Sequence, residues 1–195
     1  MASADGRFVI AYNGEIYNAR DVAADLPGRN WRGHSDTEVL IEACAAWGVE
    51  KATSRFIGMF AFALWDKAEH KLTLVRDRLG IKPLYYGRQG NVFLFASELK
   101  ALRAHPAFKP HISPEAIAAY LRLGYVPSPL SVFEGISKLP PGHILTVDAD
   151  GNERLDCYWS VREKAIAGQS ALDQRADDEI IDDVAALLTD AVGRR

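Results

Sequence analysis

AYNGEIYN, residues Ala11–Asn18, is the stretch around which this chain is organised, and it is read together with SDTE, Ser35–Glu38. The first stretch follows an apolar run at Arg7–Tyr12, which predicts a strand covered on both faces. Asn13-Gly14 is a turn dipeptide and predicts that this strand stops there. Both stretches are polar and both adjoin an apolar element, so we predict that they line one pocket.

The second stretch predicts the start of a helix. Ser35 is a favourable N-cap, and Glu38 follows three residues later in the capping-box pattern. In that pattern Glu38 reaches back to the backbone N–H of Ser35, which would leave Asp36 free to point at a ligand. The helix is expected to run to Trp47. Apolar positions recur on one of its faces at helical spacing, so we interpret Cys44 as a packed core thiol rather than a nucleophile.

The other elements alternate short helices with strands. A loose polar segment, 161–175, is a candidate linker, and 177–192 has the apolar stripe of an amphipathic helix. Asp150-Gly151 is a hairpin signal. The expected elements are helix 19–26 stopped by Pro27, strands 57–66, 72–75, 84–86 and 92–96, helices 98–105 and 113–124, and strands 144–147 and 154–159.

Composition excludes several function classes. The chain of 195 residues is 48% hydrophobic and 25% charged with a net charge of -3, which is an ordinary globular balance without a basic block for nucleic acid. Its longest purely apolar run, Met59–Trp65, is far too short to span a membrane. Two cysteines make no disulfide framework, and the five histidines show no metal-ligand spacing. We therefore expect no metal site.

Four residues of the two polar stretches carry useful chemistry. Asn13 offers a side-chain NH2 and Gly14 a backbone N–H that no Cβ shields, and two such donors can stabilise an oxyanion. Glu15 and Asp36 offer carboxylates that suit a cationic group. The plainer alternative is that Asn13-Gly14 is only a turn and Asp36 only a helix-start residue, because neither motif is specific by spacing alone.

Five motifs follow one another along the chain: AYNGEIYN, GHSDTEVLIEACAAWG, FIGMFAFALWD, VRDRLGIKPLYY and FASELKAL, and LPPGHILTV continues them. In this order they resemble the class II glutamine amidotransferase domain of glutamine-hydrolysing asparagine synthetases. The resemblance implies an α+β fold of the N-terminal-nucleophile hydrolase type, a four-layer αββα sandwich that is incomplete here. It also implies a domain organisation: 1–160 as the later part of the glutaminase domain, 161–175 as linker, and 176–195 as the first helix of an adenine-nucleotide α-hydrolase-like, ATP-dependent synthetase domain.

The resemblance assigns roles to the four residues. Asn13 and Gly14 match the family's oxyanion hole and are the predicted catalytic groups, and they also bind glutamine. Glu15 matches the neighbouring residue that holds the amino end of the substrate, and Asp36 matches the carboxylate that binds its α-ammonium. His34 lies close to Asp36 in sequence and is a candidate to line the same pocket. Glu98 receives no catalytic role, and the segments around Arg76-Asp77 and 82–85 are interpreted as structural.

The same resemblance implies a nucleophile that these motifs do not supply. In the family, a cysteine at the mature N-terminus attacks glutamine and its own α-amino group serves as base. Here Met1-Ala2-Ser3 stands first, and the arginine segment that would clamp the glutamine carboxylate belongs upstream. We therefore expect an internal fragment that is inactive alone, with exposed sheet edges and poor solubility.

For the parent protein the resemblance implies glutamine hydrolysis that supplies ammonia for ATP-dependent amidation of aspartate to asparagine. ATP and Mg²⁺ would bind outside this chain, with no cofactor inside it. The expected partners are glutamine, aspartate and ATP, without nucleic acid or membrane; a homodimer is left open, and the expected location is cytoplasmic. Two alternatives remain: another class II amidotransferase with a different acceptor, and a non-catalytic binding protein of the same fold.

Overall fold

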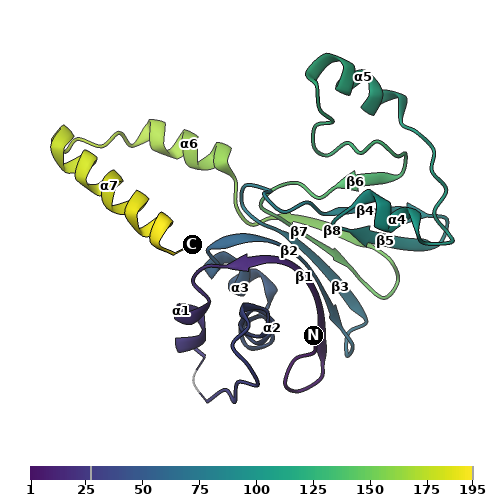
Figure 1. Cartoon of the computed structure of the whole chain (residues 1–195), viewed down its shortest axis with the longest axis horizontal. Helices are drawn as coiled ribbons and strands as arrows, with labels where there is room; N and C mark the ends of the chain where they lie inside the picture. The colour runs from purple at the N-terminus through teal and green to yellow at the C-terminus, as the bar shows by residue number, and fades with distance from the viewer. Residues whose placement is uncertain (27, 195) are drawn as a thin grey trace.

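A five-stranded antiparallel sheet forms the centre of the molecule (Figure 1), which a computed structural model describes over residues 1–26 and 28–194. Its strand order is β1-β2-β3-β7-β8, so β1 and β8 are the edge strands. Pro27, the expected stop of the first helix, and Arg195, the last residue of the expected second domain, lie outside the described residues. The bounds are β1 Phe8–Ile16, β2 Gly58–Asp66, β3 Lys71–Arg76, β7 His143–Val147 and β8 Glu153–Cys157.

A second, smaller sheet packs against the first. It has the order β5-β4-β6, with β4 at Tyr85–Gln89, β5 at Val92–Ala96 and β6 at Ile136–Lys138. Apolar side chains of the large sheet, such as Leu74 and Leu145, meet Leu84 and Leu139 between the two sheets.

Helices cover the outer faces of this pair of sheets. α1 (Ala19–Ala24), α2 (Asp36–Trp47) and α3 (Val49–Arg55) lie on the far side of the large sheet, and α4 (Leu99–Arg103) packs on the small one (Figure 1). The result is the predicted α+β sandwich with the layer order helix, sheet, sheet, helix.

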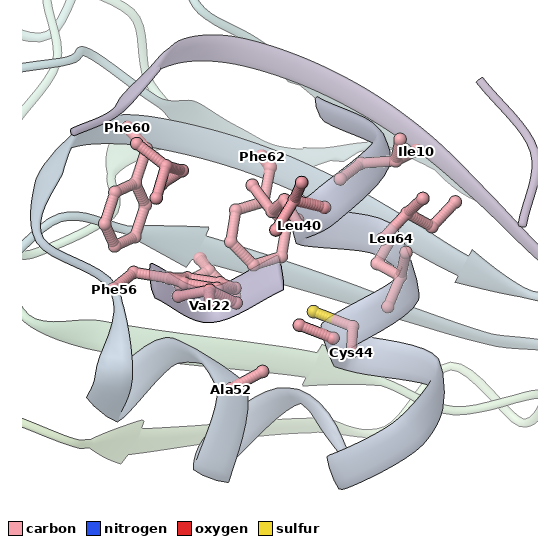
Figure 2. Packing of buried hydrophobic residues seen from close by; sticks show 14 of the residues in the cluster. Ile10, Val22, Leu40, Cys44, Ala52, Phe56, Phe60, Phe62 and Leu64 are labelled. Carbon is pink, nitrogen blue, oxygen red and sulfur yellow. The ribbon is translucent and has the colours of Figure 1, made fainter. Parts of the chain in front are cut away.

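The alternation of side chains on β2 explains why two cores form. Phe60, Phe62 and Leu64 point toward the helices, whereas Ala61 and Ala63 point toward the second sheet. Figure 2 shows the first of these cores, in which the three side chains of β2 lie over residues of α1, α2 and α3. The prediction that this strand is buried on both faces is confirmed.

The predicted turn at Asn13-Gly14 is wrong. β1 continues through both residues to Ile16, with Gly14 opposite Phe60 in an unbroken register. A Cβ at Gly14 would lie 2.3 Å from the backbone oxygen of Met59, so glycine is needed here for close packing rather than for a turn. Pairing with β2 has overridden the local turn propensity.

The predicted capping box at the start of α2 is confirmed for Ser35 and wrong for Glu38. The Ser35 hydroxyl accepts from the N–H of Thr37 at 3.1 Å, as a cap should. Glu38 does not reach back to Ser35. Its carboxylate is buried and accepts instead from the N–H groups of Arg32 and Gly33, at 2.8 and 2.9 Å. The backbone N–H groups of the loop before the helix thus take the place of the Ser35 N–H as donors to this carboxylate.

Three helices lie away from the sandwich. α5 (Pro114–Leu123) stands beyond the small sheet, and α6 (Val161–Ser170) and α7 (Asp177–Gly193) extend past the end of β8 (Figure 1). Most of the segment expected to be a loose linker is therefore helical, while the amphipathic helix at 177–192 is confirmed. No side chain of α6 or α7 is buried, and their assignment to a second domain stays a prediction.

Within the part of the chain that the structure describes, no helix is long and apolar enough to cross a membrane.

Candidate functional site

The outer edge of β1 carries the first part of the candidate site. In an antiparallel pair, alternate residues bond to the partner strand and the others turn their N–H and C=O groups away. The N–H of Lys67 bonds to the oxygen of Arg7, and the N–H of Tyr17 bonds to the oxygen of Ile57, so the odd-numbered residues of β1 face β2. The N–H groups of the even-numbered residues therefore point outward.

Contacts at both ends of this edge confirm the alternation. The N–H of Ile10 donates to the oxygen of Met1 at 2.8 Å, and the N–H of Ile16 donates to Asp36 Oδ2 at 2.9 Å. The N–H groups of Tyr12 and Gly14 lie between these two points and face the same way. The edge of β1 thus presents Gly14 as a backbone donor, as an oxyanion hole requires.

Asp36 is anchored to this edge by one of its oxygens. Oδ2 accepts from the Tyr12 hydroxyl at 2.7 Å as well as from Ile16, so the expectation that Asp36 is entirely free is wrong. Burial raises the pKa of Tyr12, and its hydrogen bond to Asp36 adds to the rise, so the phenol stays protonated and keeps donating. Oδ1 is approached by the Thr37 hydroxyl at 3.5 Å, a weak contact that leaves it able to accept from a cation.

Gly14 and Asp36 are close enough to serve one small ligand. The N–H of Gly14 and that of Ile16, which holds Asp36, are two strand residues apart, or about 7 Å. An extended amino acid with a four- or five-carbon skeleton has comparable length. The structure therefore brings these two predicted residues together along one strand edge.

The side chain of Asn13 lies apart from this pair. It points to the opposite face of β1, where its Nδ2 donates to Ser97 Oγ at 3.1 Å. Together with Phe62 and Leu84 it lines a cavity of about 170 Å³ between the sheets, and Asp36 does not line that cavity. Asn13 and Asp36 thus line different cavities, so the prediction of one pocket shared by all four residues is wrong, while the backbone of Gly14 lies near Asp36 on the edge of β1. Glu15 is exposed and shares the face of Asn13 by strand alternation.

A cleft of about 530 Å³ opens beside Asp36, between α1 and the loop that leads into α2. His34 is exposed and lines it, as expected from its place in the sequence. Arg20 and Arg32 contribute guanidinium groups, and Ala23 contributes to an apolar wall. The cleft can therefore receive a ligand that carries charges of both signs.

Comparison with known proteins identifies the family. Residues 1–159 match the family described as "Glutamine amidotransferase domain". The chain belongs to this family. It is 36% identical over 191 residues to asparagine synthetase [glutamine-hydrolyzing] 3 of Bacillus subtilis (strain 168), covering 96% of this chain and 30% of that protein. It is 35% identical to asparagine synthetase [glutamine-hydrolyzing] 2 of the same strain, covering 97% of this chain and 26% of that protein. The chain thus spans less than a third of the length of these relatives.

Solved structures support the fold of this glutamine amidotransferase domain. The glutamine phosphoribosylpyrophosphate amidotransferase from B. subtilis aligns with a TM-score of 0.54 at 20% identity, covering 83% of this chain and 31% of that chain. The enzyme described as the allosteric regulatory enzyme of purine biosynthesis gives a TM-score of 0.54 at 21% identity, covering 79% of this chain and 29% of its own. The fold is accordingly the predicted N-terminal-nucleophile hydrolase-type sandwich.

The two thiols of the amidotransferase domain lie away from the β1 edge. Cys44 is packed in the core under α2, and burial raises its pKa to about 12, so it stays a neutral thiol (Figure 2). This confirms its interpretation as a core residue. Cys157 is exposed at the end of β8, with its Sγ 3.4 Å from the oxygen of Trp159. In the described parts of the chain, no group of three or more His, Cys, Asp or Glu side chains could hold a metal ion.

The segment around Arg76-Asp77 links several elements of the fold through hydrogen bonds to the backbone. The Arg76 guanidinium donates to three backbone oxygens, and the Asp77 carboxylate, 1% exposed, accepts from four backbone N–H groups. These bonds tie the ends of β2 and β3 to the loop before β4, in agreement with the structural interpretation. The acceptors of Arg76 are the oxygens of Gly80, Lys82 and Leu139, and the donors to Asp77 are the N–H groups of Phe60, Leu79, Ile81 and Lys82.

Sequence reasoning missed three residues that contact or border the candidate site. Tyr12 lies within the first motif and Ser97 within FASELKAL, but no local pattern says that they bond to Asp36 and Asn13. Arg20 was read only as part of a short helix. The alternation of β1 could have pointed to Tyr12, because it shares a face with Gly14 and Ile16. Ser97 and Arg20 depend on tertiary packing.

Proposed function

We propose that this domain binds and hydrolyses glutamine, and that the whole protein uses the released ammonia for ATP-dependent amidation of aspartate to asparagine. The observation that carries the proposal is the β1 edge, where the N–H of Gly14 and the carboxylate of Asp36 face the same side about one dipeptide apart. The family membership supports glutamine as the substrate. The names of the relatives support aspartate amidation, and the chain covers only a third or less of their length.

In this proposal each group acts at one end of glutamine. The ammonium of glutamine binds the free oxygen of Asp36, whereas the Glu15 side chain leaves β1 on the opposite face and takes no part in this contact. The N–H of Gly14 stabilises the oxyanion that forms when a nucleophile attacks the side-chain carbonyl, and the Asn13 amide adds a second donor once it turns from Ser97 toward the edge of β1. A donor of this kind lowers the barrier by about 3 to 4 kcal/mol. The terminal cysteine of the family would supply that nucleophile.

ATP and Mg²⁺ belong to the proposal for the whole protein only. The described residues offer no cluster of three metal-ligating side chains, so no step in this domain is assigned to either. A reducing, cytoplasmic setting is also part of the proposal. It is supported by the free thiols of Cys44 and Cys157.

Steady-state kinetics of glutamine hydrolysis by the whole protein tests the proposal. Asn13→Ala should lower kcat by about a hundredfold to a thousandfold with little change in KM, because it removes a donor that acts in the transition state. Asp36→Ala should chiefly weaken glutamine binding. Asn91→Ala, at an exposed turn asparagine, is the matched control and should change neither constant. Unchanged kcat in Asn13→Ala would reject the oxyanion role.

The acceptor needs a separate measurement. Supplying the whole protein with glutamine, ATP and aspartate should yield asparagine, detected by mass spectrometry. Glutamine hydrolysis without any amidated aspartate would reject asparagine synthesis while leaving the glutaminase step in place.

A further inference from the structure

In the described chain, β8 is the edge strand of the large sheet at the end opposite to β1. The hydrogen bonds next to its two ends show which of its residues face β7. The N–H of Tyr158 donates to the oxygen of Gly142 at 2.9 Å, and the N–H of Asp148 donates to the oxygen of Asn152 at 3.1 Å. Because bonding alternates along an antiparallel pair, the even-numbered residues of β8 bond to β7.

The odd-numbered residues of β8 turn their backbone groups away from β7. They are Glu153, Leu155 and Cys157, and their N–H groups and backbone oxygens have no hydrogen-bond partner among the residues that the structure describes. A row of free donors and acceptors of this kind is a template for one more strand. The side chain of Leu155 is 46% exposed, so this edge also carries apolar surface that the chain does not cover itself.

The sequence of β8 is complementary to its own reverse. Leu155 is the central residue, with Arg154 before it and Asp156 after it. When two copies of the strand lie antiparallel about Leu155, Arg154 of each copy stands opposite Asp156 of the other. Opposite charges in such cross-strand positions stabilise a sheet, whereas like charges destabilise it.

The hydrogen bonds of that pairing use the groups that are free. Leu155 pairs with its own copy and Glu153 pairs with Cys157 of the second copy, so the outward groups form about six backbone hydrogen bonds. Arg154 and Asp156 then occupy the positions without hydrogen bonds, where opposed Cα atoms lie about 4.5 Å apart and side chains are closest. Both side chains are largely exposed, with Arg154 Nε 2.9 Å from Asp156 Oδ2 within one strand, so each can add a partner of opposite charge.

We propose that two copies of this chain associate through β8, antiparallel about Leu155, so that their two large sheets join into one. A two-fold interface needs a patch that is complementary to itself, and β8 meets this condition in charge, in hydrogen bonding and in its central apolar residue. The strand has five residues, so the contact is small and the dimer weak, as is usual for interfaces below about 1,200 Å². The inference goes beyond the proposed function, because the candidate site lies on β1 at the other end of the sheet.

Sedimentation velocity of the full chain, between about 1 µM and about 1 mM, should show monomer converting to dimer as the concentration rises. Arg154→Asp and Asp156→Arg each place like charges opposite one another and should raise the dissociation constant by about tenfold or more. The double variant that exchanges the two residues should return it to that of the unmodified chain. Arg103→Asp, at an exposed arginine of α4, makes the same charge change and should leave the constant as it is.

Two further measurements identify the strand itself. An equimolar mixture of Arg154→Asp and Asp156→Arg should form dimers, because each acidic edge then meets a basic one. Amide hydrogen exchange followed by NMR should slow at the N–H of Leu155 as the concentration rises. The N–H of Arg154, which bonds to β7, should be protected at every concentration.

Three results would overturn the inference. A chain that stays monomeric up to about 1 mM has no such interface. A dimer whose dissociation constant is unchanged in both single variants is held by another surface. Dimerisation that is lost in the single variants and returns neither in the double variant nor in the mixture shows that Arg154 and Asp156 do not face one another. Circular dichroism checks that each variant is folded, and glutamine hydrolysis is measured separately, so the proposed function stands or fails independently.

Discussion

Asp77 and Asp36 are two carboxylates at the ends of regular elements, and they are used in opposite ways. Asp77 follows β3, is 1% exposed, and has both oxygens filled by four backbone N–H groups. Asp36 begins α2 and has one oxygen filled, by the Tyr12 hydroxyl and the Ile16 N–H, while the other faces a cleft. The number of internal donors decides which carboxylate is left for a ligand.

The difference teaches how a site can be recognised in this fold. A carboxylate that closes a loop with every acceptor position used contributes to stability and cannot bind anything else. A carboxylate that is fixed by one oxygen is held in position and can still bind through the other. The comparison predicts that substitutions at Asp77 act on stability, whereas substitutions at Asp36 act on affinity.

The largest effect is expected at Asp77. Asp77→Ala leaves four backbone N–H groups without their acceptor, one in β2 and three in the loop before β4, and should lower the free energy of unfolding by about 4 kcal/mol or more. Urea denaturation followed by circular dichroism measures this. Asp156→Ala, at a half-exposed carboxylate of β8, is the control and should cost less than about 1 kcal/mol. A loss at Asp77 no larger than at Asp156 would contradict the comparison.

Asp66 provides an intermediate case that depends on pH. Arg7 donates two hydrogen bonds to it, at 2.9 and 2.6 Å, and these lower its pKa from 3.8 to about 2. Because the pKa is lower in the folded state, the pair stabilises the fold fully above about pH 4, and this contribution of about 2 kcal/mol is lost as the pH falls toward 2. Urea denaturation between pH 6 and pH 2.5 should show the loss. Arg7→Gln should flatten that slope, whereas Arg103→Gln should retain it.

At Asp36 the effect on stability should be small. In Asp36→Asn the amide oxygen can still accept from Tyr12 and Ile16, so we expect a loss of about 1 kcal/mol in the free energy of unfolding. The charge that binds an ammonium is gone, and L-glutamine affinity should fall by about tenfold or more. Denaturation and calorimetry on the same protein sample test both parts. A large loss of stability with unchanged affinity would reverse the roles assigned to Asp36 and Asp77.

The parts of this fold that were predictable depend on neighbours in sequence. Ser35 caps α2 because a hydroxyl at that position reaches the N–H two residues on, and Cys44 is buried because it lies on the apolar face of the same helix. The hairpin of β7 and β8 was also predicted, since Asp150-Gly151 favours a turn and Gly151 adopts a positive φ of 84°. Each of these is a local preference that the tertiary structure does not oppose.

The parts that could not be predicted depend on pairing between distant segments. Gly14 has the sequence signature of a turn, yet its lack of a Cβ serves the packing of β1 against β2. Glu38 satisfies a local motif, yet the loop amides of Arg32 and Gly33 bind it instead. The geometry of the candidate site could not be predicted for the same reason. The motifs pointed to Gly14 and Asp36, but the strand register that places their groups on one edge is a property of the assembled sheet.

Ser97 offers the smallest and most specific test of the comparison. Its hydroxyl accepts one N–H of the Asn13 amide across the two sheets, so Asn13 is held by a single bond where Asp77 is held by four. Ser97→Ala should lower the free energy of unfolding by about 0.5 to 1 kcal/mol. It should also shift the NMR resonances of the Asn13 side-chain NH2, because that amide loses its acceptor. Ser97→Thr keeps a hydroxyl and should leave those resonances near their original positions. If the Asn13 resonances move equally in both variants, the bond does not orient the amide, and the placement of this donor has to come from β1 alone.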